Sequence, residues 1–279
     1  MDTNSNTVEQ IIDSQRGWAG RHGTRFGESN MCRAVDDNLF IAPHRYTAAE
    51  FGAGAGNELG LQESPGSMAS LRSSSALAVN VFDAWRGSDL SPLADLLGAD
   101  PAADRLRFEV QYPTGLIGTA PHLDVVIDQV GAAPLAIESK FTEIYSPAHN
   151  GFRPSYFQKP GLWDGFEASR LLAEGVEDGS MRFDHLGVAQ LIKHALGLKN
   201  AHGADGFRLL YLWYDWPGAA SDSHRDEIDR FAQIVQGAFD FETLTYQELI
   251  VGLRKIPEPR PGYLSYLEDR YFSDPATRW

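Results

Sequence analysis

Two short stretches decide the fold of this chain: residues 122–130, HLDVVIDQV, and residues 135–141, LAIESKF. Both consist mainly of β-branched and other apolar residues, which is typical of strands in the interior of a sheet. Only Gly131 to Pro134 separate them, a connection short enough for a hairpin. We therefore expect these two strands to pair antiparallel, with a third strand, Leu106 to Tyr112, preceding them.

Asp124, Glu138 and Lys140 are three of the four charged residues in these strands; the fourth is Asp128. Glu138 and Lys140 are two positions apart on one strand, so their side chains point to the same face, and Asp124 can meet Glu138 across the hairpin. An interior acid and amine are costly unless they are paired or bind something. Two converging carboxylates favour a hard divalent cation. The alternative is a simple Glu138–Lys140 ion pair on an exposed edge strand.

This set of residues is the one needed to hydrolyse a phosphodiester. Mg²⁺ held by Asp124 and Glu138 would polarise the scissile phosphate and lower the pKa of its water. The ammonium of Lys140 would orient that water and offset the charge that develops on phosphorus. We expect Mg²⁺ as the cofactor, with Mn²⁺ as the alternative, and Asp124, Glu138 and Lys140 as the catalytic residues.

The remaining periodic segments predict a mixed α/β order. Residues 1–66 are rich in glycine and lack a lasting period, so we expect a mostly irregular N-terminal arm ahead of a domain at 67–279. In that domain the pattern predicts a helix capped by Ser67 that ends before Gly87, the three strands, a second helix, and then a strand, a helix, a strand and a capped helix. The four elements after the strands are expected at His185 to Leu196, Phe207 to Tyr214, Asp226 to Gln236 and Phe241 to Leu244, and a Thr245–Glu248 capping box opens the last helix.

The second helix has a polar face that contains no acid. Val188, Leu191, Ile192 and Ala195 form its apolar stripe, whereas Gln190, Lys193 and His194 cluster on the other side. We expect these three residues to touch the substrate backbone or the metal-bound phosphate. Asn80, on the first predicted helix, is a further candidate for substrate binding. A solvated helix face is the alternative for the cluster.

Composition excludes several classes of protein. The chain has 279 residues, 43% hydrophobic and 22% charged, so it can bury a real core. Its formal charge of −14 means that contact with a nucleic acid must rest on a local site. The single cysteine, Cys32, forms no internal disulfide, and neither a signal peptide nor an apolar run of membrane-spanning length is evident. We expect a cytoplasmic protein with no membrane contact.

Familiar catalytic motifs are also absent from the sequence. No Gly-Lys pair exists for a phosphate-binding loop, and no glycine pair frames a serine as a nucleophile elbow does. The eight histidines show no His-Glu-x-x-His spacing. Asp222-Ser223-His224 holds the letters of a catalytic triad, but adjacent residues cannot converge, and we interpret it as a cap before the helix that starts at Asp226.

Asp124 followed by Glu138-Ser-Lys140 on the next strand resembles the PD-(D/E)XK nuclease superfamily, the restriction-endonuclease-like fold. The proline of the motif is displaced to Pro121. The resemblance covers about half the chain, Ser67 to Tyr214, and implies a mixed central β-sheet flanked by α-helices. It also implies a Mg²⁺-dependent nuclease, usually acting on DNA, although the superfamily includes members without nuclease activity.

The same resemblance suggests supporting residues. Many members carry Gln-x-x-x-Tyr on the helix after the lysine strand, and Gln190 with His194 looks like a histidine variant of it. Related nucleases often take an additional acid from the region of the first helix. Glu58 is the candidate here, as a further metal ligand, with Glu109 on the first strand as its rival.

The leading hypothesis is thus a metal-dependent DNA endonuclease of restriction, defence or repair type. A nuclease-fold protein that binds nucleic acid or a protein partner without cutting is the alternative, although the intact Asp–Glu–Lys set argues against it. A sugar hydrolase using Asp124 and Glu138 is disfavoured, because Lys140 opposes a raised carboxylate pKa. The choice between duplex and single-stranded DNA, and between monomer and homodimer, stays open.

Overall fold

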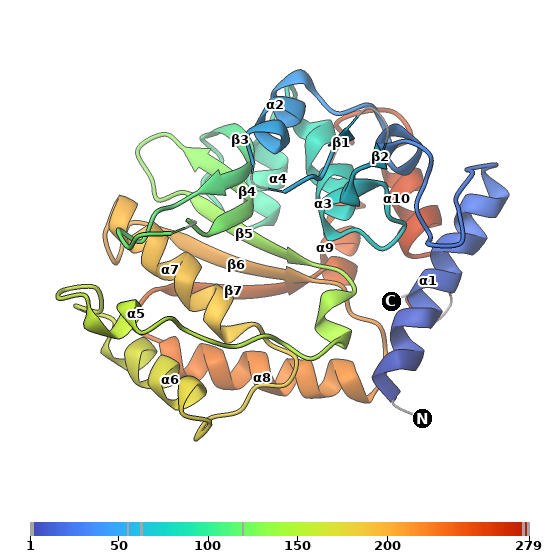
Figure 1. The fold of residues 1–279 in the computed structure, drawn as a ribbon. Helices are drawn as coiled ribbons and strands as arrows, with labels where there is room; N and C mark the ends of the chain where they lie inside the picture. Colours follow the sequence, from blue (N-terminus) through green and yellow to red (C-terminus); the bar gives the residue numbers. More distant parts are fainter. Residues whose placement is uncertain (1–2, 55, 62–63, 119, 275–276, 278–279) are drawn as a thin grey trace.

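A five-stranded mixed β-sheet forms the centre of the molecule (Figure 1). The computed structural model describes residues 3–54, 56–61, 64–118, 120–274 and 277. Three strands pair antiparallel in the order expected from the sequence, and two further strands continue the sheet in parallel with the third. In sheet order the strands are β3 (Ala103–Gln111), β4 (His122–Gln129), β5 (Leu135–Lys140), β6 (Arg208–Trp213) and β7 (Asp240–Thr245).

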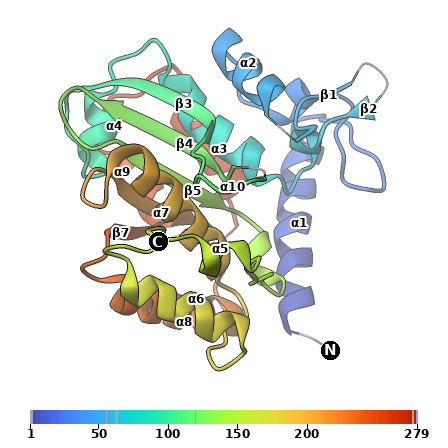
Figure 2. The same cartoon turned by 60° about the vertical axis from the view of Figure 1, so that its left-hand side comes forward.

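Helices cover both faces of this sheet (Figures 1 and 2). One face carries α2 (Arg45–Ala53), α3 (Ser74–Phe82), α4 (Ser91–Leu96), α9 (Tyr246–Leu253) and α10 (Tyr263–Tyr271). The opposite face carries α6 (Glu167–Glu177), α7 (Val188–His202) and α8 (Ala219–Val235), with the short α5 (Ser155–Gln158) beside them. Helix α1 (Thr3–Arg21) runs along one side and contacts α10 and α8. The predicted α/β sheet flanked by helices is confirmed.

Short elements complete the chain. A small hairpin joins β1 (Gly60–Leu61) to β2 (Ser64–Pro65), apart from the main sheet. Four 3₁₀ turns lie between the larger elements: η1 (Val35–Asn38), η2 (Ser67–Ala69), η3 (Asp83–Trp85) and η4 (Glu143–Tyr145). No helix in the described ranges is both long and apolar enough to cross a bilayer.

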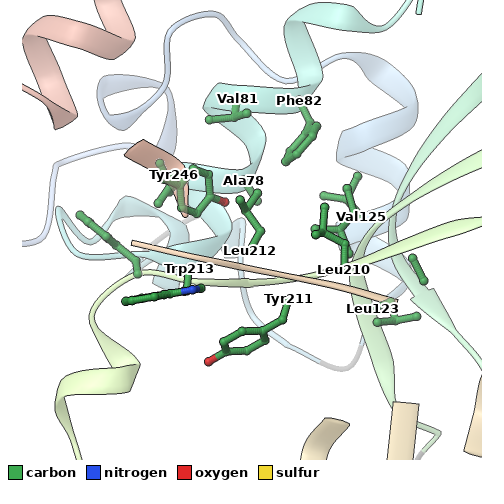
Figure 3. Close-up of a cluster of buried hydrophobic side chains, with 14 of the residues drawn as sticks. Ala78, Val81, Phe82, Leu123, Val125, Leu210, Tyr211, Leu212, Trp213 and Tyr246 are labelled. Atoms are coloured by element: carbon green, nitrogen blue, oxygen red, sulfur yellow. The ribbon is translucent and has the colours of Figure 1, made fainter. Parts of the chain in front are cut away.

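The hydrophobic core explains why β6 is apolar throughout. Successive strand residues point to opposite faces, and both faces of β6 are covered by helices. Figure 3 shows Leu210 and Leu212 directed towards Ala78 and Phe82 of α3, with Tyr211 on the other side of the strand. All five side chains are buried. The β6 side chains that face away from α3, such as Tyr211, therefore lie on the face of the sheet that α7 covers.

The expectation of a mostly irregular N-terminal arm is wrong for two segments, because α1 and α2 are regular helices. Ile11 and Trp18 of α1 and Phe51 of α2 belong to the same core cluster as the sheet. Tertiary burial of these side chains outweighs the helix cost of Gly17 and Gly20, roughly 1 kcal/mol each relative to alanine. The division of the chain at residue 66 itself stays a prediction.

Some predicted helix limits are also wrong. Ser67 is not a helix cap but the first residue of the 3₁₀ turn η2. The regular helix α3 starts later, with the Ser73 hydroxyl accepting from the backbone N–H of Ala76. Helix α8 begins at Ala219, so Asp222 to His224 lie inside the helix rather than before it. The capping box at Thr245 and Glu248 is confirmed. Helices α5, α6 and α10 had no counterpart in the sequence pattern.

One buried arginine ties the N-terminal helix to the C-terminal one. The Arg270 guanidinium is 1% exposed, lies over the ring of Trp18, and donates to the Gln15 side chain and to the Asn38 carbonyl oxygen. It also donates to the Tyr266 hydroxyl one turn away. Arg270 therefore joins α1, η1 and α10, elements that lie far apart in the sequence.

We expect Arg270→Leu to lower the free energy of unfolding by about 3 kcal/mol, because it removes the charged donor to buried oxygens of Asn38 and Gln15. Urea unfolding measures the change. The control is Arg254→Leu, since the Arg254–Glu268 ion pair is exposed and contributes no more than about 1 kcal/mol. Equal effects of the two substitutions would contradict this account.

Candidate active site

The sheet register places Asp124 and Glu138 side by side on one face. On the antiparallel pair β4–β5, Val125 faces Ile137 and Val126 faces Ala136, so Asp124 stands opposite Glu138. On the next strand, Glu138 is level with Tyr211. These side chains leave the sheet on the side away from α3, towards α7. The alternation of side chains along a strand places Glu138 and Lys140 on one face, and the register between β4 and β5 places Asp124 on that same face.

Two basic groups meet the Glu138 carboxylate. Lys140 Nζ lies 2.6 Å from Glu138 Oε1, and His194 Nε2 lies 3.0 Å from Glu138 Oε2. The Lys140 ammonium also donates to Gln190 Oε1 at 2.9 Å. Helix α7 thus supplies Gln190 and His194, four residues apart on one helix face, to the lysine and the glutamate respectively. The structure brings both members of the predicted helix pair to the strand motif.

Asp124 is held by the backbone of the neighbouring strand. Its Oδ2 accepts the N–H of Ser139 at 2.7 Å. The Ser139 side chain points to the opposite face of the sheet, where its hydroxyl pairs with that of Tyr246 at 2.6 Å. Ser139 thus makes two contacts: its side chain bonds to Tyr246 on one face of the sheet, and its backbone N–H holds the Asp124 carboxylate.

Burial and mutual repulsion give the two carboxylates different electrostatic states. Burial raises the pKa of Asp124 well above its ordinary value, and the neighbouring Glu138 charge raises it further. Burial also opposes ionisation of Glu138, but Lys140 and His194 outweigh it and lower the pKa of Glu138 to about 2. For Lys140, burial is outweighed by Glu138 and Asp124, which raise the pKa of the ammonium. The site thus holds a charged Glu138–Lys140 pair beside a carboxyl group that resists ionisation.

The donor set fits a hard divalent cation in part. Both oxygens of Glu138 are buried, and neither contact to Lys140 or His194 has the geometry of a hydrogen bond. These oxygens and the destabilised Asp124 carboxylate are groups that a cation and its waters would satisfy. In the described ranges, however, no three His, Cys, Asp or Glu side chains are arranged to hold a metal ion. The protein alone thus offers a two-carboxylate site.

A cleft of about 890 Å³ opens beside these residues. Lys140, Gln190 and Tyr211 line it from the sheet and α7. The facing wall comes from the N-terminal part of the chain and includes Glu58 and Arg72. Glu58, predicted as a further metal ligand, thus lies on the cleft wall. Its carboxylate accepts from the Ser67 hydroxyl.

Of the four residues predicted to bind substrate, Gln190 lines the cleft, and the other three do not: His194 is 2% exposed and lies against Glu138, and Asn80 and Lys193 lie elsewhere. Asn80 is 2% exposed and is engaged inside the fold, with its side-chain oxygen accepting from Phe40 N and its amide donating to the Tyr271 hydroxyl. Lys193 turns away from Lys140 and donates to the Gly151 carbonyl oxygen at 2.7 Å. The polar helix face seen in the sequence is therefore divided, with Gln190 and His194 inside the site and Lys193 beyond it.

Glu109, the sequence-based rival to Glu58, continues the row of acids across the sheet. Phe108 faces Val125 and Val110 faces Leu123, so Glu109 is level with Asp124. Its φ of +51° is a left-handed conformation rare for glutamate, and its Oε2 lies 3.3 Å from His122 Nδ1. Burial raises the pKa of Glu109, with Glu58 and Glu138 adding to the effect and His122 opposing it.

Sequence reasoning missed a buried pair beneath the cleft. The Tyr211 hydroxyl lies 3.1 Å from His224 Nε2, and His224 Nδ1 is buried without a hydrogen-bond partner. Burial lowers the pKa of His224 to about 3, so the ring is neutral. Tyr211 reads as an ordinary apolar strand residue in the sequence. Only its position level with Glu138 marks Tyr211 as a site residue, and that position follows from the parallel pairing of β5 with β6, which the sequence pattern does not give.

A comparison with protein-family models identifies the family of the chain. Residues 29–272 match the family described as restriction endonuclease associating with ARP. The chain belongs to this family. Its mixed sheet with flanking helices is therefore a restriction-endonuclease-like fold, as the Asp124 and Glu138-x-Lys140 pattern indicated. No significant match was found among curated proteins or among solved structures.

The two carboxylates of this restriction-endonuclease-like site should have opposite effects on stability at neutral pH without metal. A carboxyl group whose pKa is raised by folding destabilises the protein once the pH exceeds the pKa of that group in the unfolded chain. Asp124→Asn removes this effect and should stabilise the protein. Glu138 has a lowered pKa, and its stabilisation is present above pH 4.5 and lost as pH falls towards 2. At pH 7, Glu138→Gln should therefore destabilise, by roughly 1 to 2 kcal/mol, because it removes the charge partner of the Lys140 ammonium, which is part exposed on the cleft wall.

Urea unfolding at pH 7 in EDTA measures both effects. Glu174→Gln is the matched control, because Glu174 forms an exposed pair with Arg170 and its loss should change little. Destabilisation by Asp124→Asn as large as that by Glu138→Gln would contradict the assigned electrostatics.

Proposed function

We propose that this protein is a Mg²⁺-dependent nuclease that hydrolyses phosphodiester bonds in DNA. The observation that carries the proposal is the convergence of Asp124, Glu138 and Lys140 on one face of the sheet, with the Lys140 ammonium on the wall of an open cleft. Membership of a restriction endonuclease family supports it. When bound, Mg²⁺ would supply a Lewis acid for the scissile phosphate and lower the pKa of an attacking water.

Asp124 and Glu138 are the residues that would hold the cation. Their oxygens are hard donors, and bringing a positive charge between them relieves the repulsion that raises the pKa of Asp124. The Ser139 N–H keeps the Asp124 carboxylate aimed at this point. Preorganisation by the backbone means that little rearrangement is needed when the cation arrives.

Lys140 acts as a fixed positive charge rather than as a base. Its raised pKa keeps the amine protonated at neutral pH, so it donates to a phosphate oxygen or to the attacking water. Glu138 and Gln190 hold the ammonium from two sides. Gln190 is therefore a positioning residue for Lys140, and His194 has the same role for Glu138.

The alternative is a nuclease-fold protein that binds nucleic acid or a protein partner without cutting. One observation favours it: the described residues provide two carboxylates near Lys140 and no three-ligand metal cluster. The lowered pKa of Glu138 excludes that residue as the acid of a sugar hydrolase, whereas the raised pKa of Asp124 does not exclude Asp124, and it is the family match that favours a nuclease over a sugar hydrolase. Cleavage assays separate the first two possibilities.

We expect the wild-type protein to cut plasmid or single-stranded DNA in the presence of Mg²⁺, and EDTA should abolish cleavage. Mn²⁺ is tested in parallel. Asp124→Asn, Glu138→Gln and Lys140→Met should each reduce the rate by at least about 10²-fold, the scale of losing one group that stabilises transition-state charge. Asp128→Asn is the matched control, since Asp128 lies on β4 and pairs with Arg107 away from the cleft. Cleavage by the Asp124 and Glu138 variants at the wild-type rate would place the chemistry elsewhere.

A further inference from the structure

A second hollow lies beside Lys193 of α7. It has a volume of about 160 Å³ and is bounded by the loop between β3 and β4. Arg153, Tyr156 and Lys193 form part of its lining. The cleft and this hollow are both lined from α7, by Gln190 and by Lys193 respectively, three positions apart. A strand of substrate that crosses this end of α7 would pass from one to the other.

The loop presents an isoleucine directly to water. Ile117 is 101% exposed, and it stands between Gly115 and Gly118, whose φ values of +74° and +135° few other residues adopt. The backbone thus holds an apolar side chain outward at a turn that glycine makes accessible. Nothing in the described part of the chain packs over Ile117, so its apolar surface is available to a partner.

Cations gather around this apolar tip. Arg153 is exposed, and neither Arg153 nor Lys193 lies within ion-pair distance of an acid among the described residues. Lys193 Nζ lies 5.0 Å from the centre of the Phe152 ring and 5.7 Å from that of Tyr156, which fixes the direction of its chain. Burial, and after it the Arg153 charge, lower the pKa of Lys193, whereas the Glu177 charge raises it. In a chain of formal charge −14, this is a local site of positive charge.

We propose that the hollow is a second DNA-contact surface, in which Arg153 and Lys193 bind one backbone phosphate and Ile117 packs against the base or sugar beside it. Paired cations match a phosphate, and apolar side chains contact nucleotides wherever they enter a groove or a base step. A purely apolar protein partner has no need of the two cations. The proposal rests on DNA being the substrate of the catalytic cleft and adds a contact outside it.

The test is DNA binding, measured by fluorescence anisotropy with labelled 30-nucleotide single-stranded and 30-base-pair duplex DNA. Ca²⁺ replaces Mg²⁺ so that cleavage does not interfere. Arg153→Ala and Lys193→Ala should each weaken binding, and the double variant, which leaves the shared phosphate without a cation, should reduce the slope of log affinity against log salt by about 0.9 for duplex and about 0.7 for single strands. Ile117→Ser should weaken binding up to roughly tenfold and leave the salt slope unchanged, since its contact is apolar.

Two control variants match these changes elsewhere on the surface. Val130→Ser removes another exposed apolar side chain, 68% exposed, at the β4–β5 turn. Arg170→Ala removes an exposed arginine on α6 that pairs with Glu174. Both should bind DNA as the wild type does. Larger losses from the controls than from Ile117→Ser and Arg153→Ala would overturn the proposal.

The outcome is separable from the test of nuclease activity. The protein could bind DNA in a salt-dependent way through Ile117, Arg153 and Lys193 and yet cut no DNA. That result would support the second DNA-contact surface and contradict the proposed nuclease activity. Normal binding by all three variants, with cleavage intact, would reject the surface and leave the nuclease standing. Absence of DNA binding by the wild type also overturns the proposal, and a pull-down with the Ile117→Ser variant as reference would then test the loop as a protein contact.

Discussion

The contact between Glu138 and Lys140 is the constraint around which the site is organised. A carboxylate that is 1% exposed on an interior strand is costly by itself, and the ammonium 2.6 Å away offsets part of that cost. The second carboxylate oxygen faces His194, so α7 must lie where its imidazole reaches the strand. Gln190, one turn earlier, then meets Lys140. The pairing of two charges on β5 thus sets the position of a helix that begins almost fifty residues later.

Asp124 stands in a different relation to the fold. Its carboxylate is held by a backbone N–H, yet burial and Glu138 both disfavour its charge. Such a destabilised group is typical of positions where function opposes stability, and in the proposed nuclease a bound cation would relieve the repulsion. Glu109 extends the row of acids and occupies a left-handed backbone conformation, another feature that proteins retain mainly at functional positions. The charge of Asp124 is therefore disfavoured by its surroundings, whereas the charge of Glu138 is paired with Lys140.

The N-terminal part of the chain does more than precede the sheet. Helix α1 is joined to α10 through Arg270, and the segment after it supplies one wall of the cleft, including Glu58 and Arg72. The cleft is thus formed by chain segments far apart in sequence. The sheet and α7 line one side of it, and this N-terminal wall lines the other. A protein with net charge −14 can bring DNA to such a place only through local cations.

The sequence by itself determined the antiparallel hairpin, the shared face of Glu138 and Lys140, and the pair Gln190 and His194. These follow from strand and helix periods, which are local properties of the chain. Only the tertiary structure decided which polar residues face the cleft. Lys193 shares a helix face with Gln190 in the sequence pattern but turns to Gly151, and Asn80 is engaged by Phe40 and Tyr271. The helical state of residues 3–21, despite Gly17 and Gly20, was likewise decided by burial against α10, since contacts between distant segments leave no local period to detect.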